Sequence, residues 1–182
     1  VPVLESKTNG MVDATRNWVI TGRERHVARA REGMLPYPQR ALRTPDYLYI
    51  INFKPARWPM GDPNNITADT APNFNTLANN TFITFGDLDA SPTKAWLIGK
   101  RNEPKWKWHY NYAFGKRPRE ELFILKNDPD QIKNVADNPK YATIKKKLNA
   151  QLMAELKRTG DPRVTGDGTT FDKLPFAGDF HR

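Results

Sequence analysis

The chain has 182 residues, a formal net charge of +9 and 38% hydrophobic residues, enough for one domain with a core. It contains no cysteine, which excludes a disulfide framework and a zinc–thiolate site, and no apolar run near ~18 residues that would predict a membrane span. Fifteen prolines accompany five tryptophans and nine phenylalanines, which indicates long ordered loops rather than disorder. The chain opens without Met or a signal-like pattern, so we expect it to be a piece of a longer protein.

Two β-rich segments occupy the first third of the chain. The run 18–21 predicts a short buried strand that ends at Gly22 and opens into the loop Arg23-Glu24-Arg25-His26. The runs 40–44 and 47–53 flank Pro45-Asp46 and predict a β-hairpin buried on both faces, because apolar side chains occupy alternate and intervening positions.

The middle of the chain mixes loop and helix signals. Residues 54–81 show no periodicity and predict a long loop. Ser91-Pro92 predicts a helix start, with Asp87 and Asp89 near the positive end of its dipole. The run 106–114 is ambiguous: its aromatic residues alternate as in a strand, but Gly115 is typical of a helix end.

The segment 120–163 carries the clearest pattern. Residues 120–125 predict a buried strand, and Asn138-Pro139 predicts the start of a long helix that ends before Gly160. One apolar stripe runs along this helix at three- and four-residue spacing: Tyr141, Ile144, Leu148, Leu152 and Leu156. We expect residues 145–147, three lysines, to be exposed.

Two further expectations concern the flanks of this segment. Lys116 and Arg117 are expected to pair with Glu120 and Glu121. Residues 164–182 are expected to form an extended strap held by Phe171, Phe176 and Phe180.

Several segments have amino-acid sequences that are typical of one protein family. Glu120-Glu121-Leu122-Phe123, the Asn127-Asp128-Pro129-Asp130 turn, Asn134-Val135-Ala136 and the helix ending Thr159-Gly160-Asp161-Pro162-Arg163 closely resemble the C-terminal end of type I sulfatases, a formylglycine-dependent, alkaline-phosphatase-like family. Segments within 22–53, together with 89–94 and 114–118, are similar to bacterial relatives of heparan N-sulfatase (N-sulfoglucosamine sulfohydrolase). The resemblance runs from about residue 16 to 163 and favours a helix for 106–114.

We therefore predict an α+β fold, with a small antiparallel sheet of about four strands covered by the long C-terminal helix. The resemblance implies that this is the C-terminal subdomain of a larger α/β sulfatase. In this division residues 1–22 are the C-terminal end of the large α/β catalytic domain, residues 23–163 form the sulfatase C-terminal subdomain, and residues 164–182 form an extended tail.

The resemblance also implies chemistry that these residues do not supply. The family converts a Cys or Ser in a Cys/Ser-x-Pro-x-Arg motif to formylglycine, the nucleophile, and binds calcium through carboxylates. The only serines here are Ser6 and Ser91, and neither is followed by x-Pro-x-Arg. No carboxylate cluster suited to a cation with six or more oxygen ligands stands out. We thus assign no catalytic or metal-binding residue and expect the formylglycine and the calcium site to lie upstream.

Four residues are predicted to contact substrate: His26, Arg23, Arg25 and Arg40. His26 follows a strand end, where ligand loops of open α/β sheets sit, and arginine matches an oxyanion with paired donors. The alternatives are that Glu24 or backbone holds His26, and that Arg40 fixes the hairpin to a carboxylate. His109 is expected to be structural.

The predicted function is therefore hydrolysis of sulfate esters or sulfamates on heparan-type sulfated saccharides by the parent protein. The expected partners are this saccharide and the N-terminal catalytic domain, with no nucleic acid or membrane, and the expected location is periplasmic or secreted. The alternatives are a non-catalytic module that binds a polyanion, either sulfated sugar or nucleic acid, and a phosphodiester or phosphonate hydrolase of the same superfamily.

Overall fold

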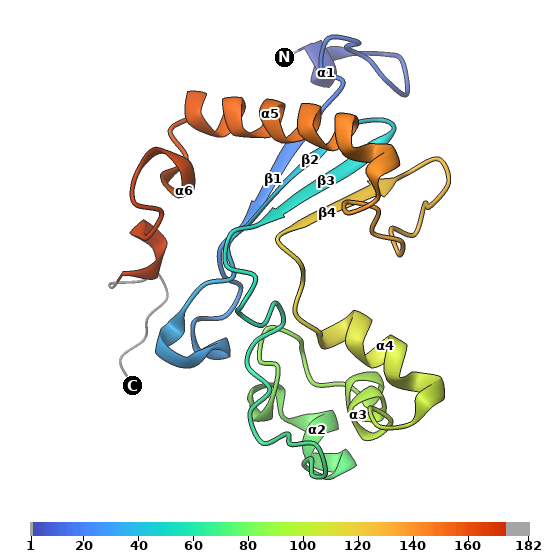
Figure 1. Cartoon of the computed structure of the whole chain (residues 1–182), viewed down its shortest axis with the longest axis vertical. Helices are drawn as coiled ribbons and strands as arrows, with labels where there is room; N and C mark the ends of the chain where they lie inside the picture. The colour runs from blue at the N-terminus through green and yellow to red at the C-terminus, as the bar shows by residue number, and fades with distance from the viewer. Residues whose placement is uncertain (1, 174–182) are drawn as a thin grey trace.

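The chain forms an α+β fold with a four-stranded antiparallel sheet and a long helix near its C-terminus (Figure 1). The structure is a computed structural model and describes residues 2–173. The sheet has the order β1-β2-β3-β4, with strands at Val19–Arg23, Gln39–Arg43, Tyr47–Asn52 and Glu120–Ile124. The hairpin of β2 and β3 pairs Leu42 with Tyr49, as the alternation of the sequence predicts.

Helix α5 (Ala142–Arg158) packs across one face of the sheet (Figure 1). Its predicted stripe is confirmed: Leu148, Leu152 and Leu156 are buried in one core with residues from three of the strands. The sheet side chains of this core are Leu42, Tyr49, Ile51 and Leu122. Gly160 ends the helix in the left-handed conformation, with φ of 72°. We call the sheet together with α5 and the short helix α6 (Pro162–Thr165) the sheet lobe.

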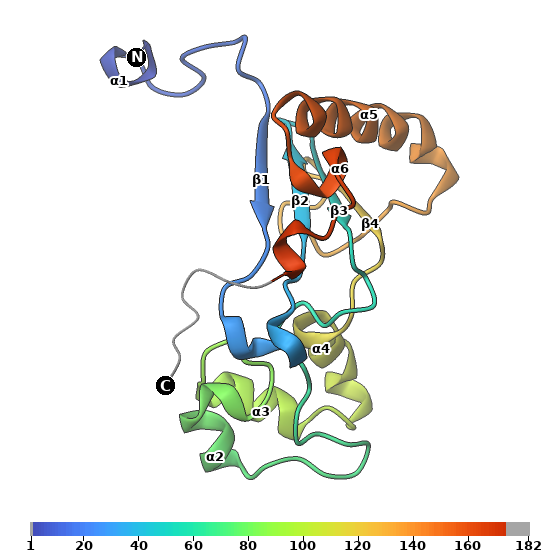
Figure 2. The same ribbon diagram turned by 90° about the vertical axis from the view of Figure 1, so that its left-hand side faces the viewer.

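A second core lies in a separate group of short helices, which we call the helical lobe. It contains α2 (Phe74–Asn79), α3 (Pro92–Gly99) and α4 (Pro104–Phe114). In Figures 1 and 2 this lobe lies below the sheet lobe, and residues 24–38 lie between the two. The buried side chains of its core are Leu77, Phe85, Ala95, Ile98 and Phe114.

The helical lobe is built around one buried lysine. Lys94 is 1% exposed, and its ammonium donates to the carbonyls of Thr81 at 3.1 Å, Phe85 at 3.2 Å and Leu88 at 2.7 Å. These three carbonyls lie in a segment without long helices or strands. The ammonium therefore supplies the hydrogen bonds that regular secondary structure would otherwise provide to these backbone oxygens. Burial lowers the pKa of Lys94.

Gly61 brings the backbone of the helical lobe against residues 24–38. It has φ of 95°, and a Cβ at this position would lie 2.6 Å from the amide nitrogen of Gly86 and 2.8 Å from the carbonyl of Ala30. Only glycine allows both this backbone conformation and this close approach.

Three sequence expectations about the sheet and its neighbours are corrected. β1 is an edge strand and not buried: Trp18 is 37% exposed and Val19 is 51% exposed. The segment 54–81 is not entirely loop, because α2 begins within it. Lys145 is half-buried and pairs with Glu120 at 3.3 Å, whereas the two following lysines are exposed as expected.

The expected pairing of Lys116 and Arg117 with the glutamates of β4 is wrong. Glu120 and Glu121 point to opposite faces of the strand, and each finds a partner on its own face: Tyr49 and Lys145 for Glu120, and Asn52 for Glu121. Lys116 and Arg117 instead lie over aromatic rings.

The C-terminal segment is not a simple extended strap. It forms α6 and a 3₁₀ turn at Thr170–Asp172, designated η5. Arg163 lies over the ring of Phe171, 5.6 Å from its centroid. The other two predicted anchors, Phe176 and Phe180, lie outside the described residues.

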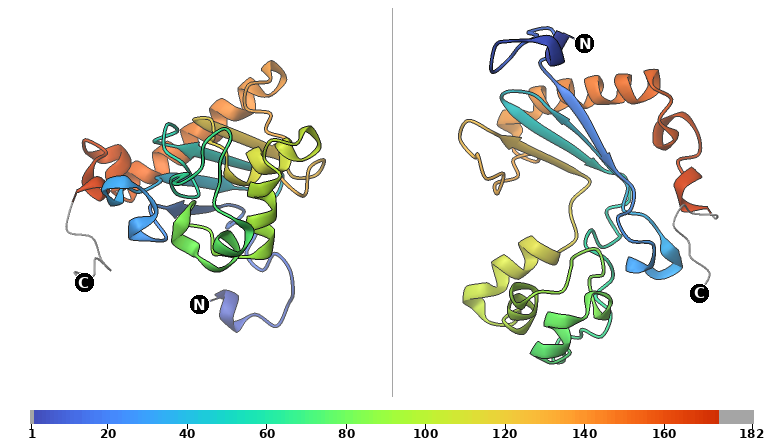
Figure 3. Two further views of the ribbon diagram at one scale, coloured as in Figure 1. Left: turned by 90° about the horizontal axis from the view of Figure 1, so that it is seen from below. Right: turned by 180° about the vertical axis from the view of Figure 1, so that it is seen from behind.

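The remaining helical elements are short. α1 spans Pro2–Glu5, and 3₁₀ turns span Ala28–Ala30 (η1), Glu32–Met34 (η2), Thr81–Ile83 (η3) and Pro139–Tyr141 (η4). Figure 3 shows α1 and the N-terminal end beyond the sheet lobe, away from the helical lobe. Within residues 2–173 no helix is both long and apolar enough to cross a membrane.

Candidate anion-binding loop

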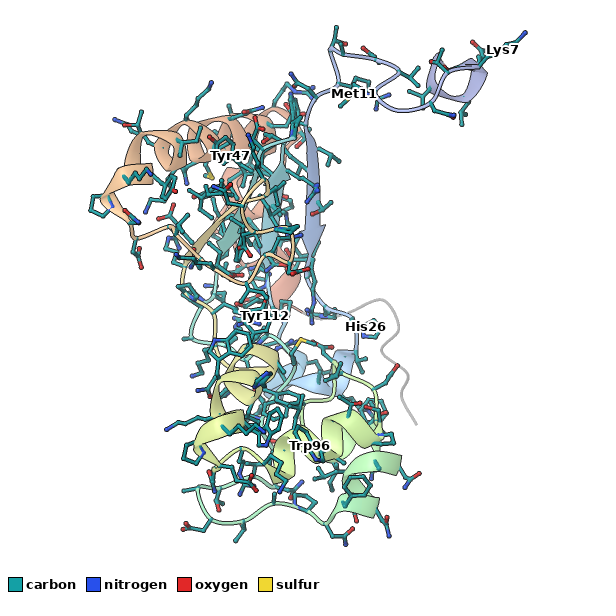
Figure 4. The ribbon with its side chains drawn as sticks, turned by 90° about the vertical axis from the view of Figure 1, so that its right-hand side faces the viewer. Lys7, Met11, His26, Tyr47, Trp96 and Tyr112 are labelled. Atoms are coloured by element: carbon teal, nitrogen blue, oxygen red, sulfur yellow. The ribbon has the colours of Figure 1, made fainter. Side chains whose placement is uncertain are left out.

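The predicted site residues gather where β1 ends. Arg23 is the last residue of β1, and Arg25 and His26 follow it in the segment that leads to η1. Figure 4 shows His26 at the narrow part of the molecule, between the sheet lobe and the helical lobe. His26 is exposed, whereas Arg23 and Arg25 are half-buried.

Arg23 and a second arginine, Arg31, hold one buried carboxylate between them. Asp87 accepts from Arg23 Nη2 at 2.7 Å, from Arg31 Nη2, and from the backbone N–H of Val27 at 3.0 Å. Both guanidinium groups also donate to the carbonyl of Pro59 at 2.8 Å. Burial lowers the pKa of Arg31. The expectation that Asp87 serves the helix dipole of α3 is therefore wrong, because its carboxylate joins the end of β1 to the helical lobe.

Arg40 lies beside this cluster on the neighbouring strand. Its guanidinium donates to Asp161 Oδ2 at 2.6 Å and to Glu24 Oε1 at 2.8 Å, and the residue is 6% exposed. The side chain crosses directly over Gly22, where a Cβ would lie 2.9 Å from Arg40 Cδ. The sequence-based alternative, in which Arg40 fixes the hairpin to a carboxylate, is confirmed.

The same carboxylates bind the C-terminal segment. Arg163 donates to Glu24 and to Asp172, the latter at 2.9 Å, and its side chain is 1% exposed. Arg57 donates to Asp172 Oδ2 at 2.7 Å. Within the described residues, Glu24 accepts from Arg40 and Arg163 and not from His26, so the alternative that Glu24 holds His26 is wrong.

These ion pairs form two groups, which are joined where Arg40 Nη1 donates to the backbone carbonyl of Arg23 at 3.2 Å, and together they carry an excess of positive charge. We define the waist network as the six arginines and four carboxylates that meet between the lobes: Arg23, Arg25, Arg31, Arg40, Arg57 and Arg163 with Glu24, Asp87, Asp161 and Asp172. Six positive and four negative groups leave a surplus of two positive charges. The surplus lies with the two arginines around Asp87 and with Arg25, the residue before His26, and positive charge of this kind suits an oxyanion such as sulfate.

The loop itself is fixed rather than free. Arg25 donates to the carbonyl of Phe171 at 2.7 Å, and burial lowers the pKa of Arg25. Behind the loop the ring of Tyr37 lies under Arg31, 5.8 Å from the guanidinium carbon, and burial raises the pKa of its phenol to about 12. The hydroxyl of Tyr37 forms no hydrogen bond with the described residues.

Parts of this chain are similar to sulfatases. A stretch of 76 residues, 42% of this chain, is 34% identical to an ulvan-active sulfatase of Formosa agariphila. A second protein of that name from the same organism is 38% identical over 65 residues, 36% of this chain. The matched stretches span 12% and 13% of these two relatives, about an eighth of their length.

Two other comparisons add little to this relationship. An uncharacterized protein of Haemophilus influenzae is 36% identical over 53 residues, which are 29% of this chain and 27% of that protein. No family model matches the chain.

Sequence reasoning named the loop but not the residues that fix it. The structure brings together Arg23, Arg25 and His26, and it places Arg40 opposite Gly22, one position before Arg23. The roles of Arg31, Arg57 and Arg163 were missed; of their carboxylates, Glu24 and Asp87 were given other roles and Asp172 was not named. Within the described residues, no group of three or more His, Asp or Glu side chains is arranged to hold a metal ion.

Proposed function

We propose that this chain is the C-terminal part of a sulfatase that hydrolyses sulfate esters or sulfamates on a sulfated saccharide. The partial identity with the two ulvan-active sulfatases carries the proposal. The resemblance of segments within 22–53 favours a heparan-type saccharide, and the names of the relatives add ulvan as a second candidate substrate. In this proposal the formylglycine nucleophile and the calcium ion belong to an upstream catalytic domain, in a periplasmic or secreted protein.

The exposed edge of the sheet supports an upstream partner domain. Trp18, Val19 and Ile20 line a groove of about 360 Å³ against the end of α5. An unprotected edge strand with exposed apolar side chains can pair with another chain and cause aggregation, so such an edge is normally covered. The catalytic domain that precedes Val1 is the proposed cover.

The sheet face opposite α5 extends this surface. Val19, Leu48 and Phe123 share one row across the sheet with Arg43, and Ala41 and Ile50 share the next row with Thr21 and Glu121. Leu48 and Ile50 are only half-buried. In the proposal the catalytic domain packs on this face and holds β1 so that its C-terminal loop meets the substrate.

In the proposed complex the loop residues divide their roles. His26, being exposed, donates to a sugar hydroxyl or a sulfate oxygen, and Arg25 adds positive charge beside it. Arg23 and Arg40 are assigned to the same substrate site but act chiefly by holding the loop, because their guanidinium groups already bind carboxylates.

The test uses the full-length protein produced together with a formylglycine-generating enzyme. We expect sulfate release from a heparin or ulvan oligosaccharide, and loss of roughly ten- to hundredfold in turnover for His26→Ala, as for one hydrogen bond to a charged group. Lys146→Ala, on the exposed side of α5, is the control and should leave turnover unchanged.

Other substrates separate the competing functions. A small aryl sulfate that does not reach the loop should be cleaved equally by His26→Ala and by the parent protein. Release of phosphate from a diester, with no release of sulfate from any saccharide, would favour the phosphodiester hydrolase. A protein that cleaves none of these compounds would contradict the proposal.

A further inference from the structure

The outer face of α4 carries exposed aromatic rings. Its inner side chains, Tyr110, Ala113 and Phe114, pack into the core of the helical lobe. The opposite side of the helix presents Trp108, which is 51% exposed, and Tyr112, which is 37% exposed. Two adjacent exposed rings on one helix face form a contiguous apolar patch, and such patches mark interaction sites more often than single exposed side chains do.

These rings are held in a fixed arrangement. Trp108 and Tyr112 stack with centroids 5.1 Å apart and planes 14° apart. The guanidinium of Arg117 lies 5.1 Å from the centroid of Tyr112 and donates to the carbonyl of that residue. The hydroxyl of Tyr112 donates to the carbonyl of Gln131 at 2.9 Å, which ties the stack to the loop after β4.

The charge of α4 and its flanking residues is positive. Residues 100–117 contain six lysines and arginines and one carboxylate, Glu103. That carboxylate already accepts from Lys100 at 2.6 Å. Lys105 and Lys107 are exposed on α4 itself, and Lys116 follows the helix. The helix therefore presents flat rings bordered by a surplus of cations.

We propose that this outer face of α4 binds a sulfated polysaccharide at a second position, separate from the loop of His26. The proposal rests on the proposed sulfatase function for the choice of ligand. The C–H groups of a pyranose ring pack against the negative face of an aromatic ring, and sulfate groups on the same chain meet the lysines. Tryptophan and tyrosine are enriched at the cores of protein interfaces, whereas lysine is depleted there, so it is the lysines and not the rings that favour a polyanion over a protein partner.

The position of α4 gives the second site a distinct role. In Figure 1 α4 and the η1–η2 segment lie on opposite sides of the molecule, and Figure 4 shows Tyr112 and Trp96 on the side facing the viewer. In the proposal only a polymer, and not a short substrate, reaches both places. A polymer bound at α4 stays near the enzyme between turnovers, which raises its effective concentration at the first site.

Binding is tested by calorimetry on the 182-residue chain with a heparin hexasaccharide and an ulvan octasaccharide. We expect at least one to bind, and Trp108→Ala to weaken its binding about tenfold, as for an aromatic hot spot. Trp108→Phe keeps a flat ring and should retain most of the affinity. Phe82→Ala removes an equally exposed ring (60%) outside α4 and should have no effect.

Two non-sugar polyanions distinguish the ligand class. Polyvinyl sulfate offers the same anions without a sugar ring, so its binding should fall with Lys105→Ala and not with Trp108→Ala. A decamer of single-stranded deoxythymidine that binds more tightly than the saccharides, and loses affinity in Trp108→Ala, would replace the sugar by nucleic acid and overturn the proposal. Saccharide binding that is absent, or unchanged in Trp108→Ala, would also overturn it.

Turnover by the full-length protein separates this proposal from the proposed function. Trp108→Ala should raise KM for the polymer severalfold and leave kcat/KM for a small aryl sulfate unchanged. If the protein releases no sulfate but binds saccharide through Trp108, the sulfatase function fails and the α4 site stands. If it releases sulfate and Trp108→Ala changes neither KM nor binding, the α4 site fails and the function stands.

Discussion

Replacement of Asp87 by asparagine is the most direct test of the waist network. The side chain of Asp87 has no exposed surface, and its carboxylate lies between the guanidinium groups of Arg23 and Arg31. Asp87→Asn keeps the size and one acceptor oxygen but removes the negative charge. Two arginines then face each other without a carboxylate between them.

The size of the effect follows from the exposure of the two partners. Breaking a buried ion pair by removing one partner typically costs about 3–5 kcal/mol, because a charge is left buried without compensation. The side chain of Arg31 is 2% exposed and cannot reach water, whereas that of Arg23 is 30% exposed and can turn outward. We therefore assign most of the loss to Arg31. For a chain of this length, a loss of this size lowers Tm by roughly 6–20 °C.

The assay is urea unfolding of the chain, followed by tryptophan fluorescence. Asp69→Asn is the matched control: Asp69 is exposed, lies outside the waist network, and should change the unfolding free energy by less than about 0.5 kcal/mol. A loss below about 1 kcal/mol for Asp87→Asn, or equal losses at the two aspartates, would refute the reasoning.

Three further predictions use the same unfolding assay. Gly61→Ala should destabilise the chain by more than about 2 kcal/mol, because its Cβ meets backbone at 2.6 Å, whereas Gly10→Ala, which has a similar positive φ but no atom within 4 Å, should cost less. Lys94→Met should cost about 2–5 kcal/mol, because three buried carbonyls lose their donor; a neutral result would show that they find water. Burial raises the pKa of Asp172, but hydrogen bonds from two arginines outweigh burial and hold this pKa below the ordinary value of 3.8. The carboxylate of Asp172 therefore stabilises the fold above pH 3.8, and this stabilisation is lost as the pH falls through the folded-state pKa. Asp172→Asn should flatten this acid dependence, and an unchanged pH profile would contradict the assignment.

The sheet lobe could be predicted from the sequence because its signals are local. Alternation in 47–53 specifies which side chains of β3 face α5, since a slip of one residue would expose all of them. The stripe Leu148, Leu152 and Leu156 specifies the buried face of α5 in the same way. Both patterns involve neighbours within a few residues, so no tertiary information is needed.

Helix α4 shows where a local pattern misleads. Its aromatic residues alternate with period two, as in a half-buried strand, but in the helix they spread around the axis. Tyr110 and Phe114, four residues apart, face the core, whereas Trp108 and Tyr112 face solvent. Pro104 at the start and Gly115 at the end were the better signals, because they are specific to helix termini.

The waist network could not be predicted because its partners are far apart in the sequence. Arg23 and Asp87 are 64 residues apart, and Arg40 and Asp161 are 121 apart. With 29 basic and 20 acidic residues, any arginine has many possible carboxylates, and only the topology selects one. Asp161 was interpreted as part of a helix stop, and it does cap α6, but its carboxylate also binds Arg40.

The network also explains why His26 is the residue of the loop that faces solvent. The two arginines that precede it, Arg23 and Arg25, are drawn inward by Asp87 and by the carbonyl of Phe171. The histidine that follows them has no comparable tie within the described residues. Its backbone is fixed on the far side as well, because the N–H of Val27 donates to Asp87 at 3.0 Å. A loop held in this way loses little conformational entropy when it binds an anion, because the ordering was completed during folding. The ion pairs that stabilise the two lobes against each other therefore also pre-organise the proposed contact with substrate, and a variant that loosens Asp87 should weaken binding at His26 even where the protein stays folded.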